Sequence, residues 1–181
     1  MRVIAGTARG VPLRAPRDRA TRPITDRVKE TLFAILGARV PDARVLDLYA
    51  GSGAIGIEAL SRGAASVDFV EHGRAALETL RGNLAAARLT EAGTVHASDV
   101  EGFLGSTTAA GPWDLVVLDP PYEVRAIVAP LRAVEPLLAP GAVVVVKHFW
   151  RTEVPAVGRL VPFRQRRFGE TMLTFLEQED A

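Results

Sequence analysis

From Arg44 onward, short apolar runs alternate with amphipathic stretches, and this alternation restricts the fold more than any other feature of the chain. Each run has four to six residues and is rich in Val, Leu or Phe, as buried parallel strands are. The runs are Val45–Tyr49, Val67–Glu71, Val95–Ser98, Leu115–Asp119 and Ala142–Lys147. The stretches with helical spacing are Ala54–Arg62, Arg74–Arg88, Val100–Leu104 and Arg125–Leu138. Strands and helices in this order predict a doubly wound α/β fold with a mostly parallel sheet.

The C-terminal part follows a different pattern. Phe163–Phe168 and Thr171–Glu177 read as two strands joined by the short turn Gly169-Glu170. A hairpin of this kind adds antiparallel edge strands to a parallel sheet. With the five runs above, the prediction is a seven-stranded sheet.

The N-terminal part is predicted to form a separate extension, residues 1–40, packed on a main domain of residues 41–181. Arg2–Ile4 and Val11–Arg14 flank a glycine-containing turn and predict a small hairpin. Thr25 is placed to cap a helix over Asp26–Leu36, which Gly37 follows.

Charge separates the two parts as well. Residues 1–44 hold ten basic and four acidic residues, a net charge of +6, whereas the remaining residues hold 12 basic and 17 acidic ones, a net charge of −5. A basic arm on an acidic body indicates contact with a polyanion. A solvated surface is the alternative that the charge run by itself leaves open.

Several classes of protein are disfavoured by composition. A chain of 181 residues has the length of about one domain. It has no cysteine, and its three histidines, His72, His96 and His148, are not spaced as zinc ligands, so we expect no metal centre. No apolar run approaches the ~18 residues of a membrane span, and the N-terminus has no signal-peptide core. We therefore expect a soluble cytoplasmic protein with no membrane contact.

The first candidate site is the segment Asp47–Gly56, which follows a predicted strand and opens a predicted helix. It contains G-x-G-x-x-G at Gly51, Gly53 and Gly56, where glycine lets the backbone turn tightly against a ligand. Glu71 ends the next apolar run, 20 residues after Gly51, where a carboxylate can accept both ribose hydroxyls of a nucleoside. The segment is therefore predicted to bind a nucleoside cofactor.

Two cofactor classes fit a glycine turn of this kind. A dinucleotide needs the helix N-terminus for its pyrophosphate, which the Asp47 carboxylate would repel. S-adenosylmethionine carries an ammonium and a sulfonium instead, and Asp47 suits both. Asp99, after the third run, is placed to accept from the adenine amino group, to cap the helix that begins at Val100, or to do both.

The second candidate site is Asp119-Pro120-Pro121-Tyr122, at the end of the fourth run. Two prolines fix the backbone and remove two N–H donors. The Asp119 carboxylate and the Pro120 carbonyl then remain as acceptors for the two N–H groups of an exocyclic amine, and Tyr122 offers a flat face on which the ring can stack. The motif predicts chemistry on an amino group of a planar ring.

Together the two motifs resemble those of class I S-adenosylmethionine-dependent amino-group methyltransferases, which have a Rossmann-like fold. A closer resemblance covers nearly the whole chain. MRVIAGTARG, TRPITDRVKETLF (Thr21–Phe33), VLDLYAGSGAIGIEALSRGA (Val45–Ala64) and LDPPY are similar to the bacterial small-subunit 16S rRNA guanine-N2 methyltransferase family. The segment TRPITDRVKE discriminates, because generic methyltransferases lack it. Ile24 and Lys29 depart mildly from the family's usual wording.

The resemblance implies an enzyme that transfers a methyl group from S-adenosylmethionine to the N2 amino group of a guanine in 16S rRNA, guanine 966 in customary rRNA numbering. The substrate is the small ribosomal subunit or its assembly intermediate, with no metal and no obligate protein partner. The implied catalytic residues are Asp119, Pro120 and Tyr122. The implied cofactor-binding residues are Asp47, Tyr49, Ala50, Gly51, Ser52, Gly53, Glu71, Asp99 and Val100. The implied substrate-binding residues are Arg22, Thr25, Arg27, Pro121 and Tyr122.

Other functions share part of this pattern. An NAD-dependent dehydrogenase has the glycine turn and the acidic residue at position 71, but it leaves Asp119–Tyr122 and the basic arm unexplained. An adenine-N6 or protein-glutamine methyltransferase uses a similar DPPY site, and the arm sequence argues against both. A non-catalytic RNA-binding assembly factor on the same fold has no need of Asp119.

Overall fold

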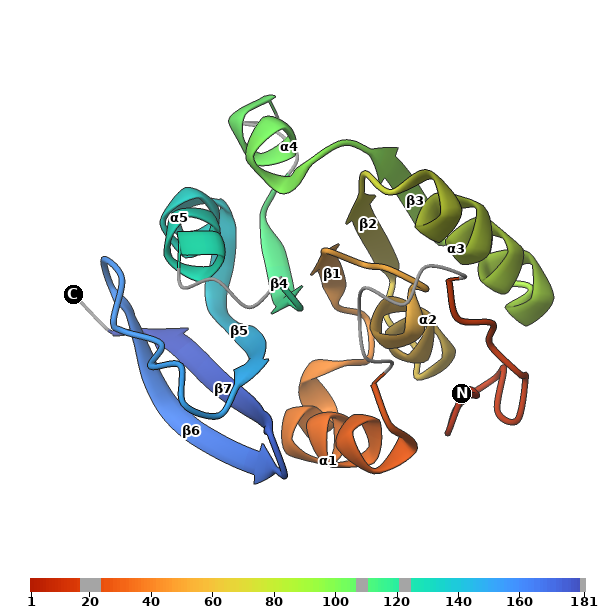
Figure 1. Cartoon of the computed structure of the whole chain (residues 1–181), viewed down its shortest axis with the longest axis horizontal. Coiled ribbons are helices and arrows are strands. Elements are labelled where there is room, and N and C mark those ends of the chain that lie inside the picture. Colours follow the sequence, from red (N-terminus) through yellow and green to blue (C-terminus); the bar gives the residue numbers. More distant parts are fainter. Residues whose placement is uncertain (17–23, 107–110, 121–124, 180–181) are drawn as a thin grey trace.

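The strand–helix alternation is present in the computed structural model, which describes residues 1–16, 24–106, 111–120 and 125–179 (Figure 1). The strands are β1 (Arg44–Leu48), β2 (Ser66–Glu71), β3 (Gly93–Ala97), β4 (Trp113–Leu118), β5 (Leu138–Phe149), β6 (Leu160–Phe168) and β7 (Thr171–Gln178). The helices are α1 (Asp26–Leu36), α2 (Ala54–Ser61), α3 (Arg74–Ala87), α4 (Val100–Ser106) and α5 (Arg125–Val134). Two 3₁₀ turns, Gly37–Arg39 and Glu135–Leu137, follow α1 and α5.

The described strands form one seven-stranded sheet in the order β3-β2-β1-β4-β5-β7-β6. Strands β1 to β5 pair in parallel, whereas β7 pairs antiparallel with both β5 and β6. The predicted fold class is therefore confirmed, including the C-terminal antiparallel hairpin. The direction in which the chain adds strands reverses between β1 and β4, and open α/β sheets bind ligands at the carboxyl ends of the strands at such a point.

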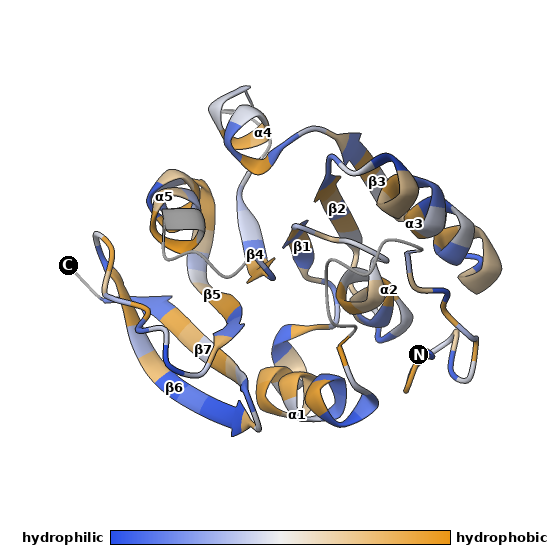
Figure 2. Ribbon diagram, in the orientation of Figure 1, coloured by the Kyte–Doolittle hydropathy of each residue, from blue (hydrophilic) through white to orange (hydrophobic). Residues whose placement is uncertain are grey.

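The sheet separates two apolar clusters, one on each face. One cluster joins the sheet to α1, α2 and α3 and includes Leu32, Ile57 and Leu80. The other joins it to α4 and α5 and includes Phe103 and Ile127. The orange, apolar stretches of the strands and of the inward helix faces follow these two layers in Figure 2. Burial on both faces explains why the parallel strands read as continuous apolar runs.

Two boundaries differ from the prediction by four residues. Helix α5 ends at Val134 rather than at position 138, because Pro136 has no N–H to donate and restricts the residue before it. Strand β5 begins at Leu138 rather than Ala142, although Pro140 and Gly141 interrupt its apolar pattern. The pairing of β4 with β5 shifts register between Trp113 and Leu115, which accommodates this irregular start.

The N-terminal residues form a reduced hairpin. Arg2 and Pro12 make a single antiparallel bridge, flanked by hydrogen bonds from the Val3 N–H to the Val11 carbonyl and from the Leu13 N–H to the Met1 carbonyl. Three of the intervening N–H groups donate instead to two side chains of α2: those of Ile4 and Ala5 to the Glu58 carboxylate, and that of Ala8 to the Ser61 hydroxyl. A regular ladder does not form because α2 takes its donors.

Helix α1 begins as predicted. The Thr25 hydroxyl accepts a hydrogen bond from the Val28 N–H at 3.4 Å, and Gly37, with φ of +51°, ends the helix. Within the described ranges, no helix combines the length and the apolar character that a membrane crossing requires.

Candidate active site

The glycine turn lies between β1 and α2, at the point where the strand order reverses. Gly51 and Gly53 both have positive φ, +55° and +76°, a region that favours glycine. A Cβ on Gly53 would lie 2.2 Å from Leu80 Cδ1, so packing against α3 also requires glycine there. The Gly53 N–H donates to the Ala50 carbonyl at 2.8 Å and closes the turn. Gly56 serves packing instead, because its Cβ would lie 2.3 Å from the Phe69 ring.

Asp47 is almost fully buried below this turn, with 2% of its surface exposed. Its Oδ2 accepts the Gly56 N–H at 2.9 Å, so the carboxyl fixes the start of α2. Burial raises the pKa of Asp47 to about 8, the Gly56 hydrogen bond opposes this, and the charges of Asp119 and Glu71 add to it. The side chain is therefore mainly protonated at pH 7 unless a cation binds nearby.

Glu71 ends β2 and organises the backbone around it. Its Oε2 accepts the Gly51 N–H at 2.9 Å, and its Oε1 accepts the N–H groups of His72 and Gly73 at 2.8 and 2.7 Å. A carboxylate has about four acceptor positions, so one remains for a ligand without loss of these bonds. The predicted contact of Glu71 with ribose stays a prediction.

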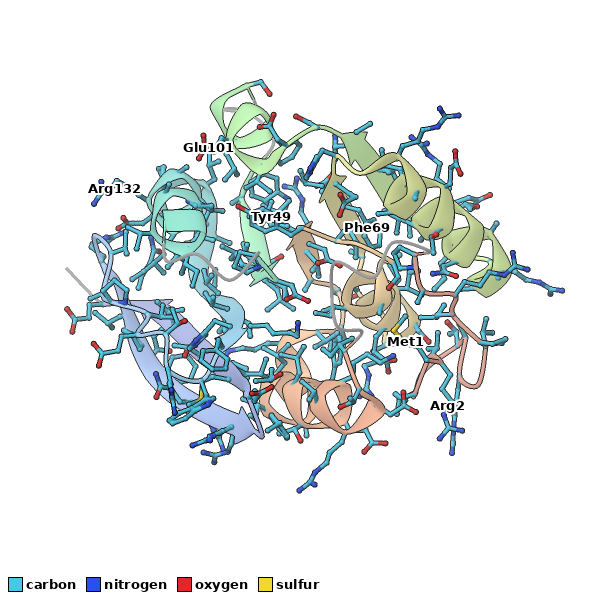
Figure 3. All side chains as sticks on the ribbon, in the orientation of Figure 1. Met1, Arg2, Tyr49, Phe69, Glu101 and Arg132 are labelled. Atoms are coloured by element: carbon cyan, nitrogen blue, oxygen red, sulfur yellow. The ribbon has the colours of Figure 1, made fainter. Side chains whose placement is uncertain are left out.

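Tyr49, Asp99 and Val100 lie together on the other side of the turn. Tyr49 has φ of +60°, which is uncommon for a residue with a side chain and recurs at functional sites. Its side chain lies between the end of β1 and α4 (Figure 3), where burial and then the charges of Glu101 and Asp99 raise its pKa. Asp99 accepts the Gly102 N–H at 2.6 Å, so the capping role is confirmed, and Val100 begins α4 as a buried residue.

Asp119 follows β4 directly, and its N–H donates to the Leu48 carbonyl of β1 at 3.3 Å. Both of its carboxylate oxygens accept from the Lys147 ammonium of β5, at 2.6 and 2.8 Å. Burial raises the pKa of Asp119, and the charge and hydrogen bonds of Lys147 oppose that rise. Pro120 is buried beside it. Pro121 and Tyr122 lie outside the described residues.

These side chains suit a cationic nucleoside. Asp47, Glu71 and Asp119 come from three neighbouring strand ends, and their mutual repulsion raises the pKa of the most buried one. A ligand with positive charge relieves that repulsion, whereas a pyrophosphate increases it. No group of acidic or histidine side chains in the described part of the chain is arranged to hold a metal ion.

Of the predicted substrate-binding residues, the structure describes Thr25 and Arg27, at the start of α1. Thr25 uses its hydroxyl to cap α1, and Arg27 is exposed on the first turn of that helix. Asp26, between them, pairs with Arg2, with Asp26 Oδ2 3.1 Å from Arg2 Nε. Arg22 lies outside the described residues.

Sequence reasoning missed two residues that the fold brings to the site. Lys147 reads as the polar end of an apolar run, and only the pairing of β4 with β5 places it against Asp119. Asn83 is 1% exposed on α3 and binds two segments at once. Its amide donates to the carbonyls of Ser52 and Arg14, at 2.9 and 3.0 Å, and its Oδ1 accepts the Arg14 N–H at 2.9 Å. The sequence signal that could have identified Asn83 is its position among the apolar residues that α3 buries.

Known proteins resemble this chain over most of its length. "Putative rRNA methyltransferase YlbH" of Bacillus subtilis is 37% identical over 175 residues, which cover 94% of this chain and 95% of that protein. "Ribosomal RNA small subunit methyltransferase D" of Escherichia coli K12 is 43% identical over 122 residues, 67% of this chain and 60% of the E. coli protein. Among solved structures, "Putative methyltransferase yhhF from Escherichia coli" has a TM-score of 0.86 and 33% identity, with 99% of this chain and 98% of that chain covered.

The model of one protein family, described as "Conserved hypothetical protein 95", matches residues 1–177. Solved structures with lower identity share the methyltransferase fold, for instance TrmN from Thermus thermophilus, with a TM-score of 0.71 and 22% identity. This chain therefore belongs to the conserved hypothetical protein 95 family, and its sheet is that of the class I methyltransferases.

Proposed function

We propose that this protein transfers a methyl group from S-adenosylmethionine to the N2 amino group of a guanine in 16S rRNA of the small ribosomal subunit, guanine 966 in customary rRNA numbering. The observation that carries the proposal is the position of Asp119. Asp119 opens the DPPY motif at the strand end next to the glycine turn. A hydrogen-bond acceptor for an amino group therefore lies next to the predicted nucleoside site. The names of the relatives support rRNA as the substrate.

The cofactor site consists of the glycine turn and the acidic residues around it. S-adenosylmethionine supplies an electrophilic methyl group when bound. Asp47 would face its cationic methionine part, Glu71 would accept from the ribose hydroxyls, and Asp99 would accept from the adenine amino group. Tyr49, Ala50, Gly51, Ser52 and Gly53 of the turn, with Val100 at the start of α4, would complete the cofactor site. Because Glu71 and Asp99 already bind backbone N–H groups, both carboxylates are held in place before the cofactor arrives.

Asp119 and Pro120 bind the acceptor amine. The amino nitrogen of guanine shares its lone pair with the ring and is a poor nucleophile. One N–H would donate to the Asp119 carboxylate and the other to the Pro120 carbonyl, which would favour the pyramidal nitrogen that receives the methyl group. The carbon–sulfur bond of the sulfonium would break as the carbon–nitrogen bond forms, S-adenosylhomocysteine would leave, and the methylated nitrogen would lose one proton to solvent. The carboxylate also stabilises the positive charge that develops on the nitrogen. Tyr122 stacks on the base, which must leave its own stack to reach the site.

The N-terminal extension, residues 1–40, docks the RNA, while residues 41–181 hold the cofactor. Its positive charge attracts phosphates; Thr25 and Arg27 lie at the start of α1, and Arg22 precedes them in the sequence. Bonds from the extension to Glu58 and Ser61 of α2 fix it on the main domain.

The test is methyl transfer from labelled cofactor to naked 16S rRNA, 30S particles and DNA side by side, with mapping of the modified nucleotide. We expect label in rRNA at guanine N2. Label at adenine N6, or in protein, would contradict the proposal. Asp119→Ala should abolish transfer while calorimetry shows cofactor affinity within about threefold of the parent. Binding of NADH in place of S-adenosylhomocysteine would assign the glycine turn to a dehydrogenase.

A further inference from the structure

A second basic surface lies far from the N-terminal extension in the sequence. Residues 150–170 hold five arginines and two glutamates, a net charge of +3 in a main domain that is acidic overall. Strand β6 carries three of these arginines within a run of exposed residues near its end, where Figure 2 colours the strand blue. We call Trp150, Arg151, Arg164, Arg166 and Arg167 the β6 arginine surface.

Strand register places this surface at the same end of the strands as Asp119. Leu173 of β7 pairs with Lys147 on one side and with Arg166 on the other. Asp119 binds that same Lys147. Three strand spacings of ~4.8 Å therefore separate the backbone beside Asp119 from that of Arg166, roughly 15 Å along the sheet edge. The arginines therefore lie at the end of the sheet that holds the proposed methyl-transfer site, not at its opposite end.

The arginine charges are not neutralised by the protein. Across the ranges that the structure describes, none of the four arginines forms an ion pair with a carboxylate. Two are held over an aromatic ring instead: the guanidinium carbons of Arg167 and Arg151 lie 3.7 and 4.9 Å from the centre of the Trp150 ring. Arg167 also donates to the Gly169 carbonyl at 2.8 Å. Their guanidinium groups are thus partly ordered before any partner binds.

We propose that the β6 arginine surface binds backbone phosphates of the rRNA strand that flanks the target base. This rests on the proposed function. A guanidinium matches a phosphate with two parallel N–H donors and is always charged. An ordered arginine loses little side-chain entropy on binding. The N-terminal extension and β6 then contact the RNA from two sides of the site and hold the extruded base between them.

The test compares two double variants with the same loss of charge. Arg166→Gln/Arg167→Gln alters the surface, and Arg81→Gln/Arg88→Gln alters exposed arginines of α3, at the opposite edge of the sheet (Figure 1). For the first variant we expect about a tenfold weaker affinity for naked 16S rRNA. The slope of log affinity against log salt should become shallower by about 1.4, because two phosphate contacts on a single strand are lost. The α3 variant should match the parent in both.

Each outcome bears on the proposal. Cofactor affinity by calorimetry and kcat at saturating RNA should stay at the parent's values, because neither arginine touches the reacting atoms. Unchanged rRNA affinity and salt slope in Arg166→Gln/Arg167→Gln would overturn it, as would a loss confined to 30S particles, which indicates a ribosomal protein as the partner. Binding is measured separately from methyl transfer. A parent that binds rRNA without methylating it therefore contradicts the proposed function, while the difference in affinity between the two variants still decides whether the β6 arginine surface binds RNA.

Discussion

The Lys147 ammonium bridges both carboxylate oxygens of Asp119, at 2.6 and 2.8 Å, across the ends of two neighbouring strands. The two side chains are largely buried, with 13% and 27% of their surface exposed. Burial alone favours the neutral form of Asp119 and raises its pKa, whereas the ammonium favours the carboxylate. Lys147 therefore holds the proposed amine acceptor in its charged form and fixes its orientation.

Replacement of Lys147 with methionine should move the acid limb of the pH–rate profile to higher pH. The groups that face Asp119 from the neighbouring strands are Lys147 of β5 and Asp47 of β1. Without the ammonium, burial acts unopposed and raises the pKa of Asp119. A shift of about 1–3 pH units is typical when an opposite charge at this distance is lost. Single-turnover rates from pH 5 to 9 measure it.

Lys147→Arg is the matched control, because it keeps the positive charge, and its profile should stay within about half a pH unit of the parent's. A uniform drop in rate at every pH for Lys147→Met would show that Lys147 only supports the local structure.

Asp47→Asn should stabilise the free protein and weaken cofactor binding. The pKa of Asp47 is about 8 in the folded chain and 3.8 as its ordinary value. Between these values the folded state keeps a proton that the unfolded state has lost, so the parent's stability falls as pH rises. The slope is about 1.4 kcal/mol per pH unit, and asparagine lacks it. Urea unfolding at pH 5, 6 and 7 should show a growing advantage for the variant.

Cofactor binding to the parent should release protons at pH 7, because a bound cation favours the Asp47 carboxylate. Calorimetry in two buffers with different ionisation enthalpies detects the release. Asp47→Asn should show little of it and an affinity at least about tenfold lower. If Asp47→Asn binds the cofactor with the parent's affinity, Asp47 does not contribute to the cofactor site.

Lys29→Met should destabilise the fold by about 3 kcal/mol. The Lys29 ammonium lies 3.2 Å from Glu58 Oε2, both side chains are fully buried, and the ammonium also donates to the Arg2 carbonyl. Loss of Lys29 leaves the buried Glu58 carboxylate with Arg62 Nε, at 2.8 Å, as its remaining counter-charge. Urea unfolding measures the change. Glu30→Gln, on the exposed side of the same helix, should cost under about 0.5 kcal/mol.

The double variant Lys29→Met/Glu58→Gln should recover part of the loss, because it removes the negative charge that Lys29 balanced. The Gln amide oxygen still accepts one of the two N–H groups, those of Ile4 and Ala5, that bond to different oxygens of Glu58. If the double variant is less stable than Lys29→Met, charge is not the reason for the loss.

Asn83→Ala should weaken cofactor binding from a position outside the turn. It removes three hydrogen bonds that join Ser52 of the turn to Arg14 of the N-terminal extension. Buried groups left without partners cost roughly 1–3 kcal/mol each. We expect lower stability and a severalfold weaker affinity for S-adenosylhomocysteine by calorimetry. Thr79→Ala, one turn earlier in α3, removes only a bond to its own helix and should leave affinity unchanged. Similar affinities in both variants would contradict the link.

Much of the site was readable from local patterns. The alternation of apolar runs predicts the parallel strands, and Thr25 and Gly37 predict the ends of α1. Gly51 and Gly53 predict a turn with positive φ, and the DPPY motif predicts an acceptor at a strand end. These features depend on side-chain period and turn chemistry within a few residues, which the sequence carries directly.

Only the tertiary structure decided which distant residues meet. Lys147 reaches Asp119 across 28 positions because β4 and β5 pair in a fixed register. Asn83 reaches Arg14 across 69 positions because α3 packs between the glycine turn and the N-terminal extension. The N-terminal hairpin has no regular ladder of backbone hydrogen bonds, because the side chains of Glu58 and Ser61 accept from its N–H groups. Such contacts follow from strand order, register and helix packing, which arise when the whole chain buries its apolar surface and which no local pattern encodes.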